Sequence, residues 1–233
     1  MFTQHHKLLN KPERRQKLVQ EFYEVHHNQN RDISTAKDDH KKISYFSAFL
    51  KKHPWNEIPE GLDLGCRGGA LTKHLKEHMA WSGVDIDRNA IELAHINGIP
   101  CLELDISVAI DFKDDSFDCI MMTEVLEHLP FPSISVKEVF RLTKKGGAFL
   151  GSVPLDYHFN RKIKLFQGKR LSGDPTHIHH FSFDELDALL KKYFDNVDYL
   201  PLRGTAARHP KLGLSYRHFV RDIAFCAWNP KKT

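Results

Sequence analysis

The stretch Gly61-Leu-Asp-Leu-Gly-Cys-Arg-Gly-Gly-Ala-Leu-Thr72 decides the fold of this 233-residue chain. Its apolar start predicts the end of a buried strand over residues 60–65, and its glycines predict a turn into an amphipathic helix over residues 69–79. Glycine supplies torsions and clearance that a Cβ atom would forbid, so bare backbone can approach a ligand. Asp85 ends the next apolar run, where nucleotide-binding α/β units place a carboxylate for ribose hydroxyls.

Five segments together resemble one protein family. Asp63-Leu-Gly-Cys-Arg-Gly-Gly69 resembles motif I of the class I S-adenosylmethionine (SAM)-dependent methyltransferases, usually Asp/Glu-x-Gly-x-Gly-x-Gly. The family's later motifs are resembled, in the same order, by Gly83-Val-Asp-Ile-Asp87, Leu104-Asp-Ile106, Ser116-Phe-Asp-Cys-Ile-Met-Met-Thr-Glu-Val-Leu-Glu-His-Leu129 and Lys144-Lys-Gly-Gly147. The Glu-His pair is common in the small-molecule (type 11, UbiG-like) subgroup. The resemblance covers about residues 55–153 and implies a SAM-dependent methyltransferase.

One position departs from the family pattern. Arg67 replaces the middle glycine of motif I, so its side chain must point away from the ligand or the loop must shift by one residue. The same residue argues against a nicotinamide cofactor, whose Gly-x-Gly-x-x-Gly fingerprint lets a pyrophosphate sit on a helix N-terminus. SAM has no phosphate, so it accepts a less open loop.

The resemblance implies cofactor roles at successive strand ends. Asp63 and the glycine backbone would face the methionine part of SAM, and Asp85 would accept hydrogen bonds from the ribose hydroxyls. Asp105 and its neighbour Ile106 would bind adenine. Thr123 and Glu124 would lie below the sulfonium. The alternative for each aspartate is a turn or cap residue. The residues expected to bind SAM are Asp63, Gly65, Cys66, Gly69, Asp85, Ile86, Asp105, Ile106, Thr123 and Glu124.

A second group of residues is expected to serve the methyl acceptor. Methyl transfer is an in-line displacement, and a sugar or alcohol hydroxyl needs a general base. His128 and His180 are the candidate bases, because imidazole titrates near neutral pH. A capping or core-edge role is the alternative for His128. Glu127, Tyr157 and His177 are the candidate acceptor contacts.

The histidine-rich segment Asp174-Pro-Thr-His-Ile-His-His-Phe181 resembles a segment that lines the acceptor pocket in several methyltransferases. Its histidines have metal-like spacing, but no nearby cysteine or acid cluster completes a zinc set. The sequence therefore predicts acceptor contact and no metal site.

Alternating strand and helix patterns predict the architecture. Parallel strands with right-handed crossovers place ligands outside the carboxyl ends of the strands. We expect an α/β, Rossmann-like fold with a seven-stranded, mostly parallel sheet, helices on both faces and an antiparallel last strand. Expected strands span residues 60–65, 81–86, 100–104, 117–122, 147–153, 194–202 and 218–228. Expected helices span residues 12–27, 34–52, 69–79, 88–97, 133–144 and 182–193.

The domain organisation follows from these elements. Residues 1–54 are expected to form a helical extension, either a lid over the cofactor or simple packing on the sheet edge. Residues 55–233 would form the SAM-binding domain, with an irregular acceptor-site insert over residues 154–181 and a Gly- and basic-rich loop over residues 204–216.

Composition limits the partners. No apolar run is long enough to span a bilayer, no secretory signal is evident, and the four cysteines are scattered, so we expect a cytoplasmic protein. The net charge is +4, but residues 151–233 carry 14 Lys and Arg against 8 Asp and Glu. That excess suits an anionic acceptor or peripheral contact with a membrane surface, or is simply a solvated basic face.

Three functions compete. The motif series favours methylation of a small, oxygen-bearing acceptor such as a quinone-type ring, a sugar or a lipid-linked intermediate. The basic C-terminal third leaves RNA methylation as an alternative, although no Asn-Pro-Pro-Tyr-type base clamp follows the fourth strand. Arg67 leaves a third, a non-catalytic SAM-binding partner subunit.

Overall fold

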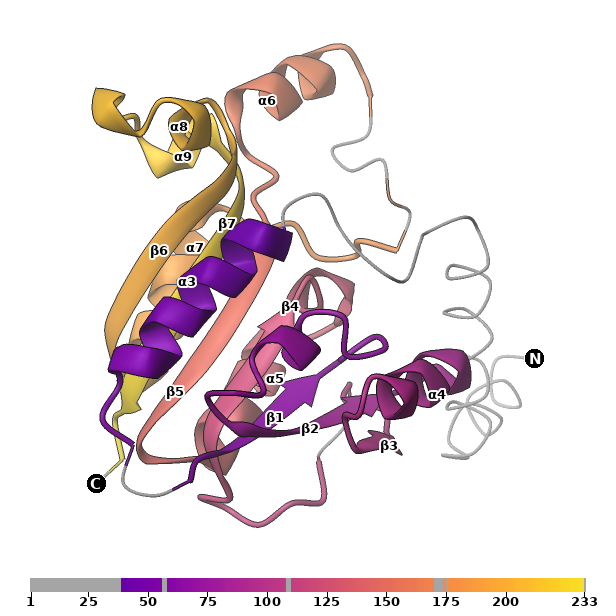
Figure 1. Ribbon diagram of the computed structural model, residues 1–233. Helices are drawn as coiled ribbons and strands as arrows, with labels where there is room; N and C mark the ends of the chain where they lie inside the picture. Colours follow the sequence, from indigo (N-terminus) through magenta and orange to yellow (C-terminus); the bar gives the residue numbers. More distant parts are fainter. Residues whose placement is uncertain (1–38, 56–57, 108–109, 170–173, 175, 233) are drawn as a thin grey trace, which may run out of the picture.

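A single seven-stranded sheet organises the molecule (Figure 1). The structure, a computed structural model, describes residues 39–55, 58–107, 110–169, 174 and 176–232. The strand order is β3-β2-β1-β4-β5-β7-β6, with β7 antiparallel to both its neighbours and every other pairing parallel. The strands are β1 (Glu60–Leu64), β2 (Ala80–Asp85), β3 (Cys101–Glu103), β4 (Phe117–Thr123), β5 (Thr143–Pro154), β6 (Phe194–Gly204) and β7 (Val220–Pro230). The predicted fold class is confirmed.

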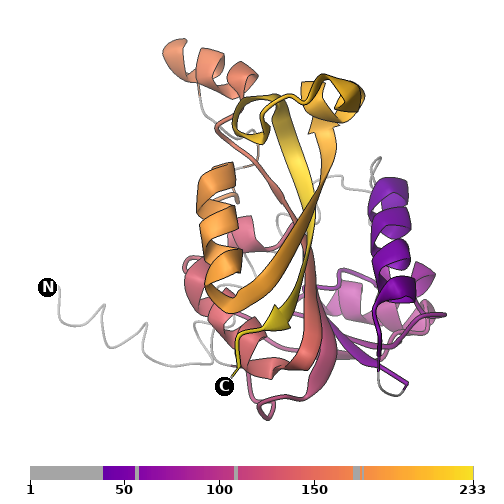
Figure 2. The same ribbon diagram turned by 90° about the vertical axis from the view of Figure 1, so that its left-hand side faces the viewer.

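Helices cover both faces of the sheet. In Figure 2 the indigo α3 stands on one side of the twisted β6–β7 pair and the orange α7 on the other. Two apolar cores result, one packed with α3 side chains such as Phe46 and Leu50, the other with α5 and α7 side chains. The helices are α3 (Asp39–Lys52), α4 (Arg88–Ile96), α5 (Pro132–Leu142), α6 (Phe159–Phe166), α7 (Phe183–Tyr193), α8 (Thr205–Arg208) and α9 (Tyr216–Phe219).

Local signals explain where the long helices begin. Asp87 caps α4 by accepting from the amide of Asn89, and Ser182 caps α7 by accepting from the amide of Glu185. Pro132 opens α5 at a position where its missing N–H costs nothing. These starts agree with the sequence predictions within about two residues. The expected helix over residues 12–27 lies outside the described residues.

The prediction of a helix over residues 69–79 is wrong. Turns and a short 3-10 helix, η1 (Thr72–His74), occupy that stretch. Arg67, Gly68 and Gly69 all have positive φ angles, so the chain cannot enter a right-handed helix until after them. Leu71, Leu75 and Met79 nevertheless remain buried, which is why the apolar pattern looked helical.

Two stretches expected to be irregular contain helices. The insert over residues 154–181 includes α6, and residues 204–216 include α8 and the 3-10 helix η3 (Pro210–Leu212), directly followed by α9. Both views show α6 beyond the edge of the sheet (Figures 1 and 2). Large apolar side chains on α6 stay exposed, Phe166 at 92%. Neither apolar core includes a side chain of α6, so burial against the core does not mark this helix in the sequence.

One edge of the sheet gathers the predicted site. The carboxyl ends of β1, β2, β4 and β5 lie there, together with the end of β6 and the start of β7. Within the described residues, no helix has the length and apolar character needed to cross a membrane.

Candidate active site

Asp85 ties the glycine loop to the end of β2. One carboxylate oxygen accepts from the backbone N–H of Arg67 at 2.7 Å, and the other accepts from the amides of Ile86 and Asp87 at 2.8 and 3.0 Å. Three amide donors thus fix the orientation of the carboxylate, which is buried. The position after β2 is the one where the ribose of a nucleoside is expected.

The backbone of motif I is folded on itself. The amides of Gly65 and Cys66 both donate to the carbonyl of Val84, at 2.8 and 3.1 Å, and the amide of Gly69 donates to the carbonyl of Cys66. A Cβ atom on Gly65 would lie 2.8 Å from the Val125 side chain, so glycine is required there by space as well as by its φ of +75°. These three amides are therefore occupied by hydrogen bonds within the protein.

Arg67 has a backbone conformation that favours glycine. Its φ is +50°, in the left-handed region that costs a residue with a Cβ about 1 kcal/mol. The Arg67 amide donates to Asp85, which ties this position to the end of β2.

Asp63 lies beneath the loop, at the end of β1. Its carboxylate accepts a short hydrogen bond from the Thr72 hydroxyl. Burial, together with the nearby charge of Asp85, raises the pKa of Asp63 to about 7, while the Thr72 bond opposes the shift. Strands β1 and β2 are parallel neighbours, with Asp63 opposite Gly83 and Leu64 opposite Val84, so the two carboxylates lie at adjacent strand ends. Two buried acids side by side favour a cation, and the SAM ammonium is one.

The adenine side is more exposed. Asp105 accepts from the amide of Ser107 at 2.9 Å, which is a turn hydrogen bond. Ile106 is half-buried and packs against the core, and Ile86 is also half-buried beside Asp85. Asp105 therefore already performs the alternative role of a turn residue, and its second carboxylate oxygen is the one available to an adenine amino group.

Glu124 follows Thr123 at the end of β4 and has a φ of +56°. Its carboxylate accepts from the Ser152 hydroxyl at 2.6 Å and pairs with Lys42 of α3 at 3.4 Å. The pKa of Glu124 is lowered, because Lys42, Ser152 and Arg203 stabilise the anion more than burial destabilises it. Helix α3 thus reaches the strand end below the expected sulfonium. The sequence offered no signal for Lys42.

A histidine–carboxylate pair lies after β5. The Nδ1 atom of His180 forms a short hydrogen bond with Asp156, whose carboxylate is fully buried and also contacts Arg161. The pKa of His180 is lowered by burial and by the Arg161 charge, so the ring is neutral at pH 7. A neutral imidazole oriented by a carboxylate is the usual form of a general base. Asp156 was missed, although its place directly after a strand was a usable signal.

A second cluster joins residues far apart in the sequence. One ligand atom from each of Glu127, His128 and His177 lies within 4.8 Å of the other two. The Nδ1 atom of His128 lies 3.1 Å from the carbonyl oxygen of Thr176, and His177 lies 3.7 Å from the Asp174 carboxylate. Two imidazoles and a carboxylate form a donor set that suits a divalent transition metal.

Glu127 is the unusual member of this cluster. Its side chain is fully buried, and neither carboxylate oxygen has a hydrogen-bond partner among the described residues. Burial and the charge of Glu124 raise its pKa well above the usual range. A bound cation would offset that cost. The sequence argument against a metal did not include this acid, because Glu127 belongs to η2 (Leu126–His128), about 50 residues before His177.

We therefore predict that the purified protein binds Zn²⁺ and that Glu127→Gln weakens binding at least tenfold, because the anionic ligand is lost. Isothermal titration calorimetry measures both values. His179→Asn is the matched control, since that histidine lies between the clusters and pairs with Glu185 instead. Equal Zn²⁺ affinity in Glu127→Gln and the wild-type protein would contradict the prediction.

The remaining predicted acceptor contact, Tyr157, lies largely at the surface. Tyr157 follows Asp156 but is 42% exposed. The predicted bases His128 and His180 belong to different clusters, one with Glu127 and one with Asp156. The segment carrying His177 and His180 runs beside η2, because the amides of Ile178 and His179 both donate to the carbonyl of Glu127. Both clusters therefore border the same edge of the sheet.

Fold and site together define a nucleoside-binding α/β enzyme with acids at neighbouring strand ends. Among known proteins, the chain is 35% identical over 130 residues to the ubiquinone biosynthesis O-methyltransferase of Nitrosococcus oceani, covering 51% of this chain and 55% of that protein. The corresponding protein of Coxiella burnetii is 32% identical over 115 residues, 45% of each chain. The chain thus spans about half the length of the curated relatives it matches.

Solved structures share the fold. A SAM-dependent methyltransferase from Archaeoglobus fulgidus superposes with a TM-score of 0.59 at 19% identity, covering 80% of this chain and 94% of that one. One from Thermotoga maritima gives 0.57 at 21% identity, covering 82% and 91%. The model of the methyltransferase domain family matches residues 18–197. The chain belongs to that family.

The site fits the cofactor. The paired buried carboxylates of Asp63 and Asp85 suit an ammonium and ribose hydroxyls, and the glycine loop between them is too tight for side chains at Gly65, Gly68 and Gly69. When bound, SAM supplies a methyl group on a positively charged sulfur, which a nucleophile can attack. The chain's own residues would then bind and orient the acceptor, and a hydroxyl acceptor would also need a base.

Proposed function

We propose that the protein methylates an oxygen atom of a small molecule, such as a hydroxyl on a quinone-type ring, a sugar or a lipid-linked intermediate. The observation that carries this proposal is the His180–Asp156 pair at the carboxyl edge of the sheet. A thiol acceptor would need no base, whereas a hydroxyl does. The O-methyltransferases among the relatives support the same choice.

The proposed step balances as follows. The acceptor oxygen forms a bond to the methyl carbon while the carbon–sulfur bond breaks, leaving S-adenosylhomocysteine. The hydroxyl proton moves to the Nε2 atom of His180, on the ring edge away from Asp156. The buried Asp156 carboxylate then stabilises the imidazolium that forms and keeps Nδ1 protonated throughout.

The test is a methyl-transfer assay with radiolabelled SAM and a panel of phenols, catechols and sugars. With the best acceptor, we expect His180→Asn to lower kcat about a hundredfold, the usual contribution of a general base, with S-adenosylhomocysteine affinity unchanged. His179→Asn is the control, because it removes the adjacent histidine that pairs with Glu185.

Two results would count against the proposal. A wild-type kcat in His180→Asn would show that His180 is not the general base. Methyl transfer to RNA but to no small molecule would favour the RNA alternative. Steep loss of RNA binding between about 50 and 200 mM salt would accompany that second result.

A further inference from the structure

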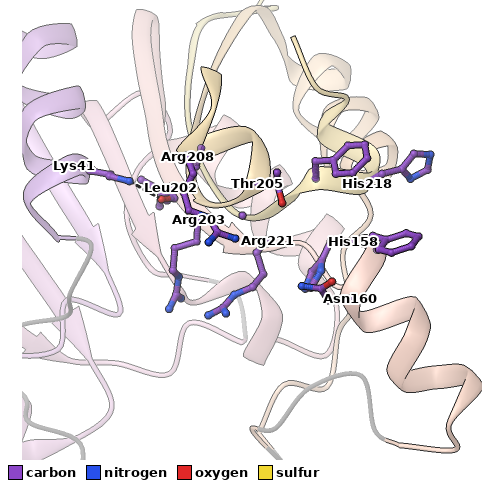
Figure 3. A pocket seen from close by; sticks show the side chains of 13 residues that line it. Lys41, His158, Asn160, Leu202, Arg203, Thr205, Arg208, His218 and Arg221 are labelled. Carbon is purple, nitrogen blue, oxygen red and sulfur yellow. Dashed lines mark hydrogen bonds between the residues drawn. The ribbon is translucent and has the colours of Figure 1, made fainter. Parts of the chain in front are cut away.

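A cavity of about 460 Å³ lies beside the proposed active site, and none of the residues assigned above to SAM or to the base lines it. The end of β6, the start of β7, α8, α9, α3 and the beginning of α6 form its walls. Its basic lining residues are Lys41, Arg203, Arg208 and Arg221, with His158 and His218 (Figure 3). The volume is typical of a small-molecule site.

The lining carries a surplus of positive charge. Arg203 and Arg221 both pair with the buried carboxylate of Asp222, the second at 3.5 Å. Figure 3 shows these two side chains pointing the same way from neighbouring strands. No acidic side chain lines the cavity itself within the described part of the chain. Lys41 donates to the carbonyl of Leu202 at 2.9 Å and not to an acid. The positive charge of the lining therefore favours a ligand with negative charge.

His158 is the polar group that lacks a counterpart. Its side chain lines the cavity, is only 7% exposed, and its buried Nε2 atom has no hydrogen-bond partner among the described residues. Burial, with the charges of Arg221 and Lys164, lowers the pKa of His158 to about 4. A buried imidazole without a partner is costly, and a ligand oxygen in the cavity would supply one.

Residues on the cavity wall lie close to the proposed methyl-transfer position. Lys41, on its wall, directly precedes Lys42, which pairs with Glu124 at the end of β4. Arg203 also acts on Glu124, because its charge helps to lower the pKa of that carboxyl. A molecule anchored in the cavity can therefore extend toward the end of β4.

We propose that this cavity binds a phosphate group carried by the methyl acceptor. The inference rests on the proposed function, since it names a chemical group of the acceptor. Several guanidinium groups and an amine suit a phosphate monoester, which carries up to two negative charges and several acceptor oxygens, better than a carboxylate. The basic excess of residues 151–233 is then a binding feature and not only a solvated face.

Phenyl phosphate is the probe, and calorimetry on the full chain measures its binding. Arg208→Gln and Lys41→Gln are each expected to weaken binding about tenfold, since each removes one charge-assisted contact. Both residues are exposed, so neither change is expected to unfold the protein. Arg217→Gln is the matched control: it removes the same charge from α9, pairs with Asp184 and does not line the cavity.

Two further measurements locate the phosphate. The double variant Arg203→Gln/Asp222→Asn removes a guanidinium together with its buried carboxylate, and it is expected to lose at least tenfold in affinity. The ring signals of His158 in NMR spectra are expected to shift on adding phenyl phosphate but not phenol. S-adenosylhomocysteine binding to the wild-type protein, measured separately, tests the proposed function, which is overturned if no binding is found. Unchanged S-adenosylhomocysteine binding in the cavity variants would show that their effect is confined to the cavity.

Each contrary outcome is distinct. If benzoate binds as tightly as phenyl phosphate, the ligand of the cavity is a carboxylate and not a phosphate. If the protein cosediments with phosphatidylglycerol but not phosphatidylcholine vesicles and does not bind phenyl phosphate, the ligand is a lipid surface and not the acceptor. Equal phenyl phosphate affinity in Arg208→Gln, Lys41→Gln and Arg217→Gln would overturn the site altogether.

Discussion

Replacing Asp85 by alanine is expected to lower the affinity for S-adenosylhomocysteine about a hundredfold, or roughly 3 kcal/mol. Two effects combine. The carboxylate is placed to accept hydrogen bonds from the ribose hydroxyls, and it also holds the amides of Arg67, Ile86 and Asp87. Without it the glycine loop loses its anchor to β2, so the melting temperature should fall as well. Calorimetry and thermal unfolding measure the two effects.

Asp87→Ala separates cofactor binding from local stability. That residue lies two positions away, carries the same charge and caps α4 through the amide of Asn89. Its loss should cost about 1 kcal/mol of stability and leave ligand affinity within about threefold. Unchanged affinity in Asp85→Ala, or equal losses in both variants, would show that the ribose does not bind at the end of β2.

Asp63→Asn is expected to stabilise the ligand-free protein and to abolish tight cofactor binding. With its pKa raised to about 7, folded Asp63 holds a proton that the unfolded chain releases near pH 4. The free energy of unfolding therefore falls as the pH rises from about 4 to 7 and is lowest above 7. Asparagine does not titrate, so at pH 8 the variant should gain about 2 kcal/mol, with little difference near pH 4.

Urea unfolding at pH 4.5 and pH 8 tests the stability half, and calorimetry tests the binding half. The loss of an anionic partner for the SAM ammonium should weaken binding at least tenfold. The two effects have opposite signs, which distinguishes a functional carboxylate from a structural one. A variant less stable at pH 8 than the wild-type protein would indicate that Asp63 is held for the sake of the fold.

Strand positions were predictable because the apolar run of a strand and the residues at its end are both local features of the sequence. A buried strand in a parallel sheet is a short apolar run. Strands β2 and β4 each end in a polar residue at the site edge, Asp85 and Thr123, and β1 ends at Leu64, directly before the glycine loop. Capping residues such as Ser182 are equally local signals. The order of motifs along the chain then identified the family.

Local patterns failed where the backbone departs from regular torsions. Residues 69–79 keep helical apolar spacing but start from three successive positive φ angles, so they form turns around Leu71 and Leu75. The reverse error affects α6, whose large apolar side chains are exposed and pack on no core. In both cases the environment, and not the spacing of apolar residues, decides the conformation.

The sheet, the glycine loop and the acids at successive strand ends could be predicted, because each depends on residues within a few positions of one another. The packing of distant segments brings together the polar groups that could not be predicted: Glu127 with His177, His180 with Asp156, and Lys42 with Glu124. The cavity that we assign to phosphate likewise draws on α3, α6, β6 and β7. Such meetings depend on how separate elements pack, and packing has no period in the sequence.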